Sequence, residues 1–536
     1  MSNDDRAEIV LLLEGTYPFV MGGVSSWVHR LISEMPERTF GLVHIAPQVD
    51  YYGSDPAYKM PENVLFLEQC GLMPPTGGEP TMPDRRHEQR LREVWAGLLQ
   101  IRAGTMHQLQ CIATLFVELA EEGLRPDDVL SSQPCWDALV ECYEREDQRQ
   151  SFLNFYWTWM FAWRPLVELL FHRVPRAGMY HTVSTGYAGL LAALASAQWQ
   201  RPMILTEHGI YTKERRIEIY SANWIQDGEH EDYVVDREAP YFRQFWNQHF
   251  EAMSRCCYEQ SSRIFTLYAD NKAAQIADGA DPDKIDIVPN GVDVASLTAA
   301  FEHAQPRAAD SPFTVAFVGR VTPIKDVRTV LAAMRLLARD VPNLLVRILG
   351  PMNEDPDYAE GCLTFAKDLG LDDVVRFEGA VNVRQELVKC DVLLLTSISE
   401  AQPLVILEAG ALGVPVVATD VGSCRELLEG RTAADRSIGT GGILTAIASP
   451  GEVACAVREL HDDGELRLRM GRSLQRRVRE LYDESEMIGA YRSVYLYWLK
   501  EAGVDVSPIE GAAATPGEAS NGEDEPVVEK PAKETV

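Results

Sequence analysis

Two glutamates eight residues apart give the sequence its clearest chemical signal. Glu400 and Glu408 lie in the stretch S-E-A-Q-P-L-V-I-L-E-A-G, residues 399–410. The apolar run at residues 392–395 is typical of a buried strand, and the pattern at residues 404–412 predicts a helix. Glu400 then falls in the turn, and Glu408 falls about two helical turns inside the helix. Because carboxylates accept hydrogen bonds from hydroxyls, this spacing is suited to binding a sugar.

The junction between this strand and this helix is also suited to an anion. Pro403 fits the first helical position, because its ring fixes φ and its missing N–H costs nothing there. The free N–H groups that follow and the helix dipole attract negative charge. The alternative is an ordinary α/β junction whose glutamates only complement the dipole. A diphosphate-linked sugar needs both amides and hydroxyl acceptors, and its predicted contacts here are Gln402, Pro403, Leu404 and Val405.

Two cations follow another predicted strand in the second half of the chain. The run at residues 313–326, F-T-V-A-F-V-G-R-V-T-P-I-K-D, places Gly319 and Arg320 just after the strand and Lys325 five residues later. A planar guanidinium and an ammonium at that edge suit a diphosphate leaving group. The alternative is a pair of solvated surface cations. The spacing after a buried strand favours the phosphate site.

Glycines and a histidine stand at comparable places in the first half of the chain. Gly22 and Gly23 follow a predicted strand at residues 9–13, and glycine there lets the backbone approach a ligand closely. They do not form G-x-G-x-x-G, which disfavours a nicotinamide cofactor. His208 follows a predicted strand at residues 203–206, on the side of an α/β sheet where ligands bind. A lone histidine is usually structural, so its position alone supports this site.

Strand and helix patterns alternate along most of the chain, which predicts an α/β protein with doubly wound parallel sheets. Residues 152–172 are aromatic-rich and long enough to be tested as a membrane span. Arg164, Pro165 and Glu168 interrupt them, which favours a buried or interfacial helix. The predicted segments are a first Rossmann-like domain at residues 1–298 with a helical insertion at about 71–172, a second at residues 311–484, a helix at 485–502 and a disordered acidic tail at 505–536.

Composition limits the partners of the chain. Of its 536 residues 80 are acidic and 50 are basic, and the net charge of −30 disfavours binding to nucleic acid. The ten cysteines show no C-x-x-C pair, and no D-x-D stands at an obvious metal position, so we expect no metal and no cofactor. The polar, acidic start is unlike a signal peptide, which predicts a cytoplasmic protein.

These motifs resemble those of the retaining glycosyltransferases of family four, which have the GT-B fold. The resemblance rests on the Gly-Gly-Val loop at residues 22–24, P-N-G-V-D at 289–293, G-R-x4-K from Gly319 and Glu-x7-Glu from Glu400. It implies two Rossmann-like domains facing a cleft, with Arg320 and Lys325 on the diphosphate and Glu408 on the ribose. It also implies that Glu400 and His208 lie against the donor sugar.

Three longer blocks resemble the subgroup of this family that acts in assembly of the Pel exopolysaccharide. They are E-G-T-Y-P-F-V-M-G-G-V-S-S-W-V-H, T-E-H-G-I-Y-T-K-E-R-R and T-S-I-S-E-A-Q-P-L-V-I-L-E-A. The resemblance implies a UDP-sugar donor, a polysaccharide acceptor and an inner-membrane synthase complex as partner. Two alternatives stay open, a sugar-nucleotide epimerase on the same fold and a non-catalytic nucleotide-sugar sensor.

Overall fold

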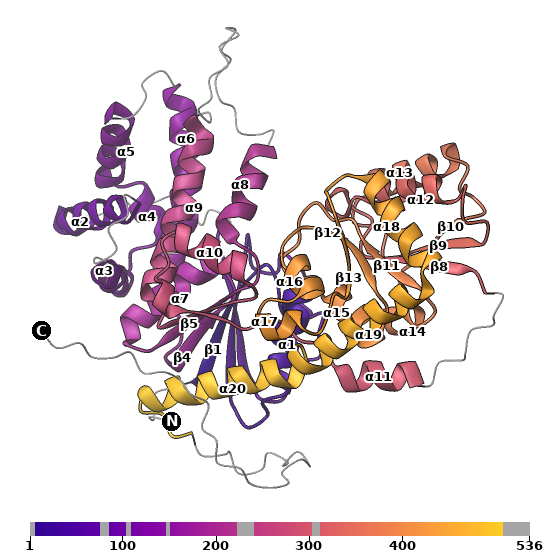
Figure 1. Ribbon diagram of the computed structural model, residues 1–536. Helices are drawn as coiled ribbons and strands as arrows, with labels where there is room; N and C mark the ends of the chain where they lie inside the picture. Colours follow the sequence, from indigo (N-terminus) through magenta and orange to yellow (C-terminus); the bar gives the residue numbers. More distant parts are fainter. Residues whose placement is uncertain are drawn as a thin grey trace, which may run out of the picture.

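The computed structural model describes residues 6–74, 85–102, 109–145, 151–221, 241–302 and 311–506, which form two parallel sheets. Figure 1 shows the sheets in two lobes, the first indigo to magenta and the second mainly orange. Their strands are apolar runs, and most are buried on both faces, so helices cover both sides of each sheet. The predicted α/β class with doubly wound sheets is confirmed.

The first sheet has seven strands in the order β3-β2-β1-β4-β5-β6-β7. Because β1 pairs with both β2 and β4, the strand order reverses beside β1, where ligands bind in such sheets. The loop after β1 leads to Gly22 and Gly23. The strands are β1 Ala7–Glu14, β2 Phe40–Ala46, β3 Val64–Gly71, β4 Ala177–Thr182, β5 Met203–Glu207, β6 Arg263–Thr266 and β7 Ile285–Ile287.

The second sheet has six strands in the order β10-β9-β8-β11-β12-β13. Here β8 pairs with β9 and β11, so the loops after β8 and β11 meet at the reversal of strand order. Those loops carry Lys325 and Glu400. The strands are β8 Phe313–Val318, β9 Leu344–Leu349, β10 Val375–Gly379, β11 Val392–Leu395, β12 Val416–Thr419 and β13 Gly442–Thr445.

Helices cover both sheets. In the first domain they are α1 Gly23–Ser33, α7 Tyr187–Trp199, α8 Tyr211–Ser221, α9 Tyr241–Gln260, α10 Ala269–Ala277 and the short η1 Pro282–Lys284. Beside the second sheet they are α11 Val294–Glu302, η2 Pro323–Lys325, α12 Val327–Leu337, α13 Pro356–Asp368, α14 Val383–Leu387, α15 Leu404–Ala411, α16 Cys424–Glu429, α17 Ala433–Arg436, α18 Pro450–Asp462 and α19 Gly464–Leu481.

Helices α2 to α6 form the insertion in the first domain. The rings of Trp95 and Trp163 lie 5.5 Å apart, centre to centre, and Trp159 packs beside them, so α6 is a core helix. Among the helices that the structure describes, none has the length and low charge that crossing a membrane requires. The bounds are α2 Arg85–Arg102, α3 Leu109–Glu121, α4 Pro126–Leu130, α5 Gln133–Arg145 and α6 Phe152–Phe171.

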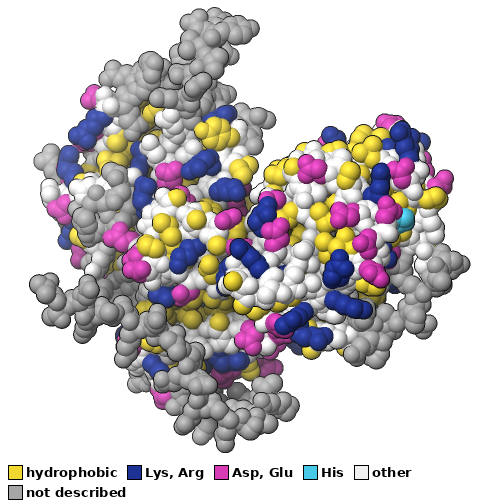
Figure 2. Space-filling view, viewed as in Figure 1, with side chains coloured by type: hydrophobic (Ala, Val, Ile, Leu, Met, Phe, Trp, Pro, Cys, Tyr) yellow, Lys and Arg dark blue, Asp and Glu magenta, His cyan; other side chains and the backbone are white. Residues whose placement is uncertain are grey.

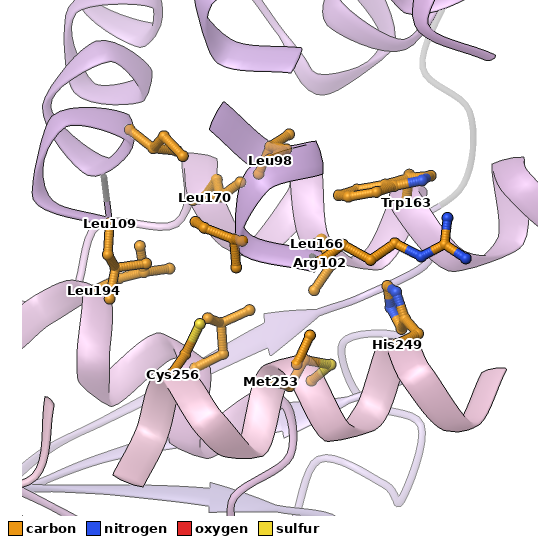
Figure 3. A pocket seen from close by; sticks show the side chains of 14 residues that line it. Leu98, Arg102, Leu109, Trp163, Leu166, Leu170, Leu194, His249, Met253 and Cys256 are labelled. Atoms are coloured by element: carbon orange, nitrogen blue, oxygen red, sulfur yellow. The ribbon is translucent and has the colours of Figure 1, made fainter. Parts of the chain in front are cut away.

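A small apolar cavity lies where the insertion meets α7 and α9 (Figure 3). Leu166, Leu194 and Met253 point into it, and its volume is about 30 Å³. That space is on the scale of one or two water molecules, and a mainly apolar lining gives them few partners. The cavity is a packing gap of the insertion and is too small for a sugar nucleotide.

The chain first leaves the first domain beside Val292, which forms an isolated parallel bridge with Asp483. The segment then enters α11, whose Leu297 packs into the core of the second domain. The boundary predicted at residue 298 therefore lies inside a helix, and the sequence of that stretch, polar and rich in alanine, does not show which domain it packs on.

The second crossing starts at Asp483 and continues into α20, Glu484–Glu501, which returns to the first domain (Figure 1). Tyr491 and Tyr495 of α20 are buried against the first sheet. Arg30 of α1 lies 2.7 Å from the carboxylate of Glu484 at the start of this helix. The predicted acidic tail beyond residue 506 lies outside the described residues.

Candidate functional site

The junction between β11 and α15 has the predicted strand-turn-helix form. Pro403 is the N-cap, with φ −73° and ψ 105°, and α15 begins at Leu404. The prediction placed Pro403 one residue further into the helix; its extended ψ places it just before. Because proline donates no hydrogen bond, the first free N–H groups are those of Leu404 and Val405, at the positive end of the helix dipole.

Lys325 and Glu400 form an ion pair across the reversal of strand order. The Lys325 Nζ lies 2.5 Å from Glu400 Oε1, and Ser397 Oγ donates to the same oxygen at 2.6 Å. Both ionic side chains are mostly covered, with 20% and 12% of their surface exposed. The structure thus brings together two of the predicted site residues, which lie 75 positions apart in the sequence. Gly319 lies beside Lys325, with φ +158°, a backbone conformation that favours glycine.

Arg320 occupies a different place. Its guanidinium donates to the carboxylate of Glu354 in the loop after β9, and 52% of the side chain is exposed. No described contact joins Arg320 to Lys325 or Glu400. The two predicted phosphate-binding cations therefore share one edge of the sheet but have separate carboxylate partners.

Glu408 opens onto a cavity of about 420 Å³ between the domains, which is the size of many ligand sites. Figure 2 shows the surface hollowed between the two lobes. Gly23 lines this cavity from the first domain, and Leu404 and Glu408 line it from the second. Burial raises the pKa of Glu408, and the charge of Arg384 opposes that rise. No described residue donates a hydrogen bond to this carboxylate, so its oxygens are available to a ligand.

Gln402 and Asn290 join the two domains beside the cavity, which Asn290 lines. Gln402 Oε1 accepts from the Asn290 N–H at 2.7 Å, and Gln402 Nε2 lies 3.4 Å from the Asn290 carbonyl. Both polar atoms of the Gln402 side chain are therefore engaged by protein backbone. The side-chain oxygen of Asn290 is buried and has no hydrogen-bond partner among the described residues, although Asn290 also lines the cavity.

His208 lies beside Trp27 of α1, with their rings 4.8 Å apart and nearly perpendicular. Burial lowers the pKa of His208 to about 4, so the ring is neutral at physiological pH. Its Nε2 is buried and has no partner among the described residues. A neutral imidazole has one donor and one acceptor nitrogen, which suits a sugar hydroxyl, because the hydroxyl both donates and accepts.

Gly22 and Gly23 open α1, with Gly22 as its N-cap. Both are exposed, and a Cβ built on either would meet nothing within 4 Å. The φ of Gly22 is 174°, an extended value that any residue adopts. These glycines therefore leave open space for a bound group at a helix N-terminus. The backbone conformation of Gly22 does not itself require glycine.

The sequence prediction missed Asn290 and Arg384. Asn290 belongs to P-N-G-V-D, which indicates a turn, and only the fold brings it opposite Gln402. Arg384 lies in a short helix after β10 with no motif of its own. Among the described residues, no group of His, Cys, Asp or Glu is placed to hold a metal ion.

Two family models match the chain. The model described as domain of unknown function (DUF3492) matches residues 7–283, and the model described as glycosyl transferases group 1 matches residues 299–477. The first match covers six of the seven strands of the first sheet, β1 to β6, together with the insertion. The second contains Lys325, Glu400 and Glu408.

Curated relatives match part of the chain. A D-inositol 3-phosphate glycosyltransferase of Paenarthrobacter aurescens is 35% identical over 204 residues, which are 36% of this chain and 47% of that protein. The protein of the same name from Geodermatophilus obscurus is 30% identical over 296 residues, 52% of this chain and 59% of its own length. The chain spans about half the length of these relatives.

Solved structures share the whole architecture. Anabaena HepE in complex with UDP has a TM-score of 0.56 at 15% identity, and the match covers 91% of this chain and 100% of HepE. Sucrose-phosphate synthase from Thermosynechococcus elongatus has a TM-score of 0.53 at 15% identity, covering 92% and 100%. The chain therefore has the GT-B fold, belongs to the family described as domain of unknown function (DUF3492), and carries a glycosyl transferases group 1 domain in its second half.

Proposed function

We propose that the protein is a retaining glycosyltransferase that moves a hexosyl unit from a UDP-sugar to a growing exopolysaccharide of the Pel type. UDP-glucose is the first candidate donor and a UDP-N-acetylhexosamine is the second. One observation carries the proposal: the Lys325–Glu400 pair, the free N–H groups of α15 and the unpartnered Glu408 carboxylate follow one another at one switch point of the second sheet.

The chemical demands of the reaction match these groups. Negative charge grows on the leaving diphosphate, where fixed cations and oriented N–H groups lower the barrier most. Lys325, Arg320 and the N-terminus of α15 supply that stabilisation. Glu408 accepts hydrogen bonds from the ribose hydroxyls. Glu400 orients the donor sugar, and His208 and the loop at Gly22 and Gly23 approach it from the first domain.

Known proteins support the donor class. Anabaena HepE has been crystallised with UDP and with UDP-glucose, and the curated relatives are named as glycosyltransferases. The Pel-type acceptor and the inner-membrane synthase complex are supported by the sequence resemblance alone. The cytoplasmic location is supported by the polar, acidic start of the sequence, and transfer without a metal ion or cofactor by its lack of C-x-x-C and D-x-D motifs. They form the finer part of the proposal.

Calorimetry against a panel of nucleotide sugars, followed by product analysis with a glycan acceptor, tests the function. The expected result is binding of a UDP-sugar, release of UDP only when acceptor is present, and retained anomeric configuration in the product. Conversion of the free nucleotide sugar without acceptor would show an epimerase instead. Binding with no turnover, even with acceptor and partners present, would show a sensor.

A further inference from the structure

Arg384 lines the interdomain cavity together with Glu408. It comes from α14, which follows β10 in the chain. The structure records no carboxylate partner for Arg384 among the described residues; its Nη1 donates to Ser296 Oγ of α11 at 3.0 Å. Arg384 is also the charge that most directly opposes the effect of burial on Glu408.

The helix that carries Arg384 is held in place by buried charges. Arg347 of β9 donates to Glu378 of β10 at 2.7 Å and to Glu386 of α14 at 2.6 Å. Lys389 donates to Glu386 as well, at 2.7 Å. Arg347 is only 9% exposed. Because paired buried charges fix the geometry of the elements that bear them, α14 presents Arg384 at a defined place.

Glu408 is useful to a nucleotide only in its ionised form. A carboxylate accepts several hydrogen bonds, whereas a protonated carboxyl competes as a donor with the two ribose hydroxyls. Burial works against ionisation, and a nearby positive charge restores it. The charge of Arg384 can therefore favour the ionised form of Glu408 at this cavity.

The other charged groups along this cavity are already engaged. Arg30 pairs with Glu484 at 2.7 Å and lies 3.5 Å from Asp293, so its charge is balanced within the first domain and the crossing segments. His29 Nδ1 lies 3.2 Å from the Tyr17 hydroxyl, and burial lowers the pKa of this histidine. Among the described residues that line the cavity with Glu408, Arg384 is thus the arginine that has no carboxylate partner.

We propose that Arg384 is a positioning residue of the donor site, which keeps the Glu408 carboxylate a pure hydrogen-bond acceptor for the ribose of the nucleotide. This deepens the proposed function and rests on it for the identity of the ligand. The anchored α14 holds the guanidinium, and the guanidinium acts through Glu408. Nucleotide recognition then stays constant over the range where an isolated buried glutamate would titrate.

A ligand-free titration tests the electrostatic step. The infrared spectrum of Glu408→Gln is subtracted from that of wild type, which isolates the carboxyl band of Glu408. For Arg384→Gln and for Arg384→Lys, the spectrum subtracted is that of the double variant that also carries Glu408→Gln. We expect the midpoint of the Glu408 band to rise by about one pH unit or more in Arg384→Gln and to stay near the wild-type value in Arg384→Lys. Identical midpoints in wild type and Arg384→Gln would overturn the inference, whatever the ligand proves to be.

A binding experiment tests the consequence for the nucleotide. We expect Arg384→Gln to bind UDP about tenfold more weakly than wild type at pH 5.5 and to recover most of the loss by pH 8, with Arg384→Lys close to wild type. With 2′,3′-dideoxy-UDP, which lacks the hydroxyls, the variant and wild type should bind alike. An equal, pH-independent loss for both probes would show that Arg384 contacts phosphate or base directly and would overturn the inference. Failure of the wild type to bind UDP would instead overturn the proposed function.

Discussion

The ammonium of Lys325 lies 2.5 Å from the carboxylate of Glu400, although the two residues belong to different loops of the second sheet. β8 and β11 are neighbours in that sheet, so their carboxyl ends bring the two loops together. An ion pair this covered is costly to break, because removing one partner leaves the other charge without compensation. The pair therefore holds both side chains in place before any donor binds.

Replacing either cation should slow transfer. We expect Lys325→Ala and Arg320→Ala each to lower turnover about tenfold or more, the scale of losing one charge-stabilising group. The loss should be larger for Lys325→Ala, because it also leaves Glu400 unpaired. Steady-state kinetics with the donor identified by calorimetry gives the measurement.

Arg458→Ala is the matched control for these variants. Arg458 is a half-exposed arginine of α18 that pairs with Asp340 on the outside of the same domain. Its removal should leave turnover within about twofold, since exposed ion pairs contribute little. Wild-type rates for Lys325→Ala would show that the ion pair is only structural.

Glu408→Gln should weaken UDP binding by about 10- to 100-fold, because hydrogen bonds to a charged acceptor contribute about 1.5–3 kcal/mol. The substitution keeps the shape of the side chain and removes its charge. Glu465→Gln, on the exposed start of α19, is the control and should bind as wild type does. If Glu408→Gln binds UDP with unchanged affinity, the ribose does not lie against this residue.

The buried His44 should make stability depend on pH. Burial lowers its pKa to about 4, so the unfolded chain takes up its proton first as the pH falls below about 6.5. Its contribution is present at neutral pH and is lost as the pH falls toward 4, on the order of 1–3 kcal/mol. Glu14 and Glu207 have raised pKa values and act in the opposite direction.

This pH effect is tested by comparing wild type with one variant, because the contributions of the buried glutamates to the pH dependence are the same in both proteins and cancel. His44→Phe keeps an aromatic ring beside Phe19 and removes the titrating group. We expect its melting temperature to fall by several degrees less than that of wild type between pH 6.5 and pH 4.5. Parallel melting curves for the two proteins would contradict the prediction.

Arg477 should be essential for the stability of the second domain. Its side chain is fully buried and donates to the Asp435 carboxylate at 2.6 Å and to the carbonyls of Leu428 and Gly439. Arg477→Met leaves a buried carboxylate and carbonyls without donors, and should cost about 3–5 kcal/mol. Denaturant unfolding measures the loss.

Arg476→Ala provides the control for that loss, since the neighbouring Arg476 is exposed and, within the described part of the chain, has Glu480 as its ion-pair partner. Its effect should stay within about 1 kcal/mol. Equal destabilisation by the two substitutions would mean that helix α19 itself, and not the buried ion pair, sets the cost.

Apolar runs bounded by glycine or proline predicted most of the strands, and β11 was predicted at its observed bounds. Two strands, β3 and β13, were not predicted. β3 is half exposed and carries Glu68 and Gln69, and β13 has only four residues, so neither forms a long apolar run. Such predictions rest on the local sequence pattern, whereas the formation of an edge strand depends on its packing against neighbouring strands.

The sequence predicted those site residues that lie in the turn directly after a strand or at the start of the next helix. That rule placed Glu400, Leu404 and Glu408 on one junction. It could not show that Arg320 donates to Glu354 or that Gln402 is held by Asn290, because those contacts join segments far apart in the chain. Arg384 had no local signal at all.

The return of α20 means that the first domain is assembled from both ends of the polypeptide. A fragment ending at residue 298 would leave the surface that receives Tyr491 and Tyr495 open to water, so it should be prone to aggregation. The same holds for chimeras: a second domain transplanted from a relative has to be followed by the recipient's own α20. To separate the two domains, the chain therefore has to be cut at both crossings, beside Val292 and beside Asp483.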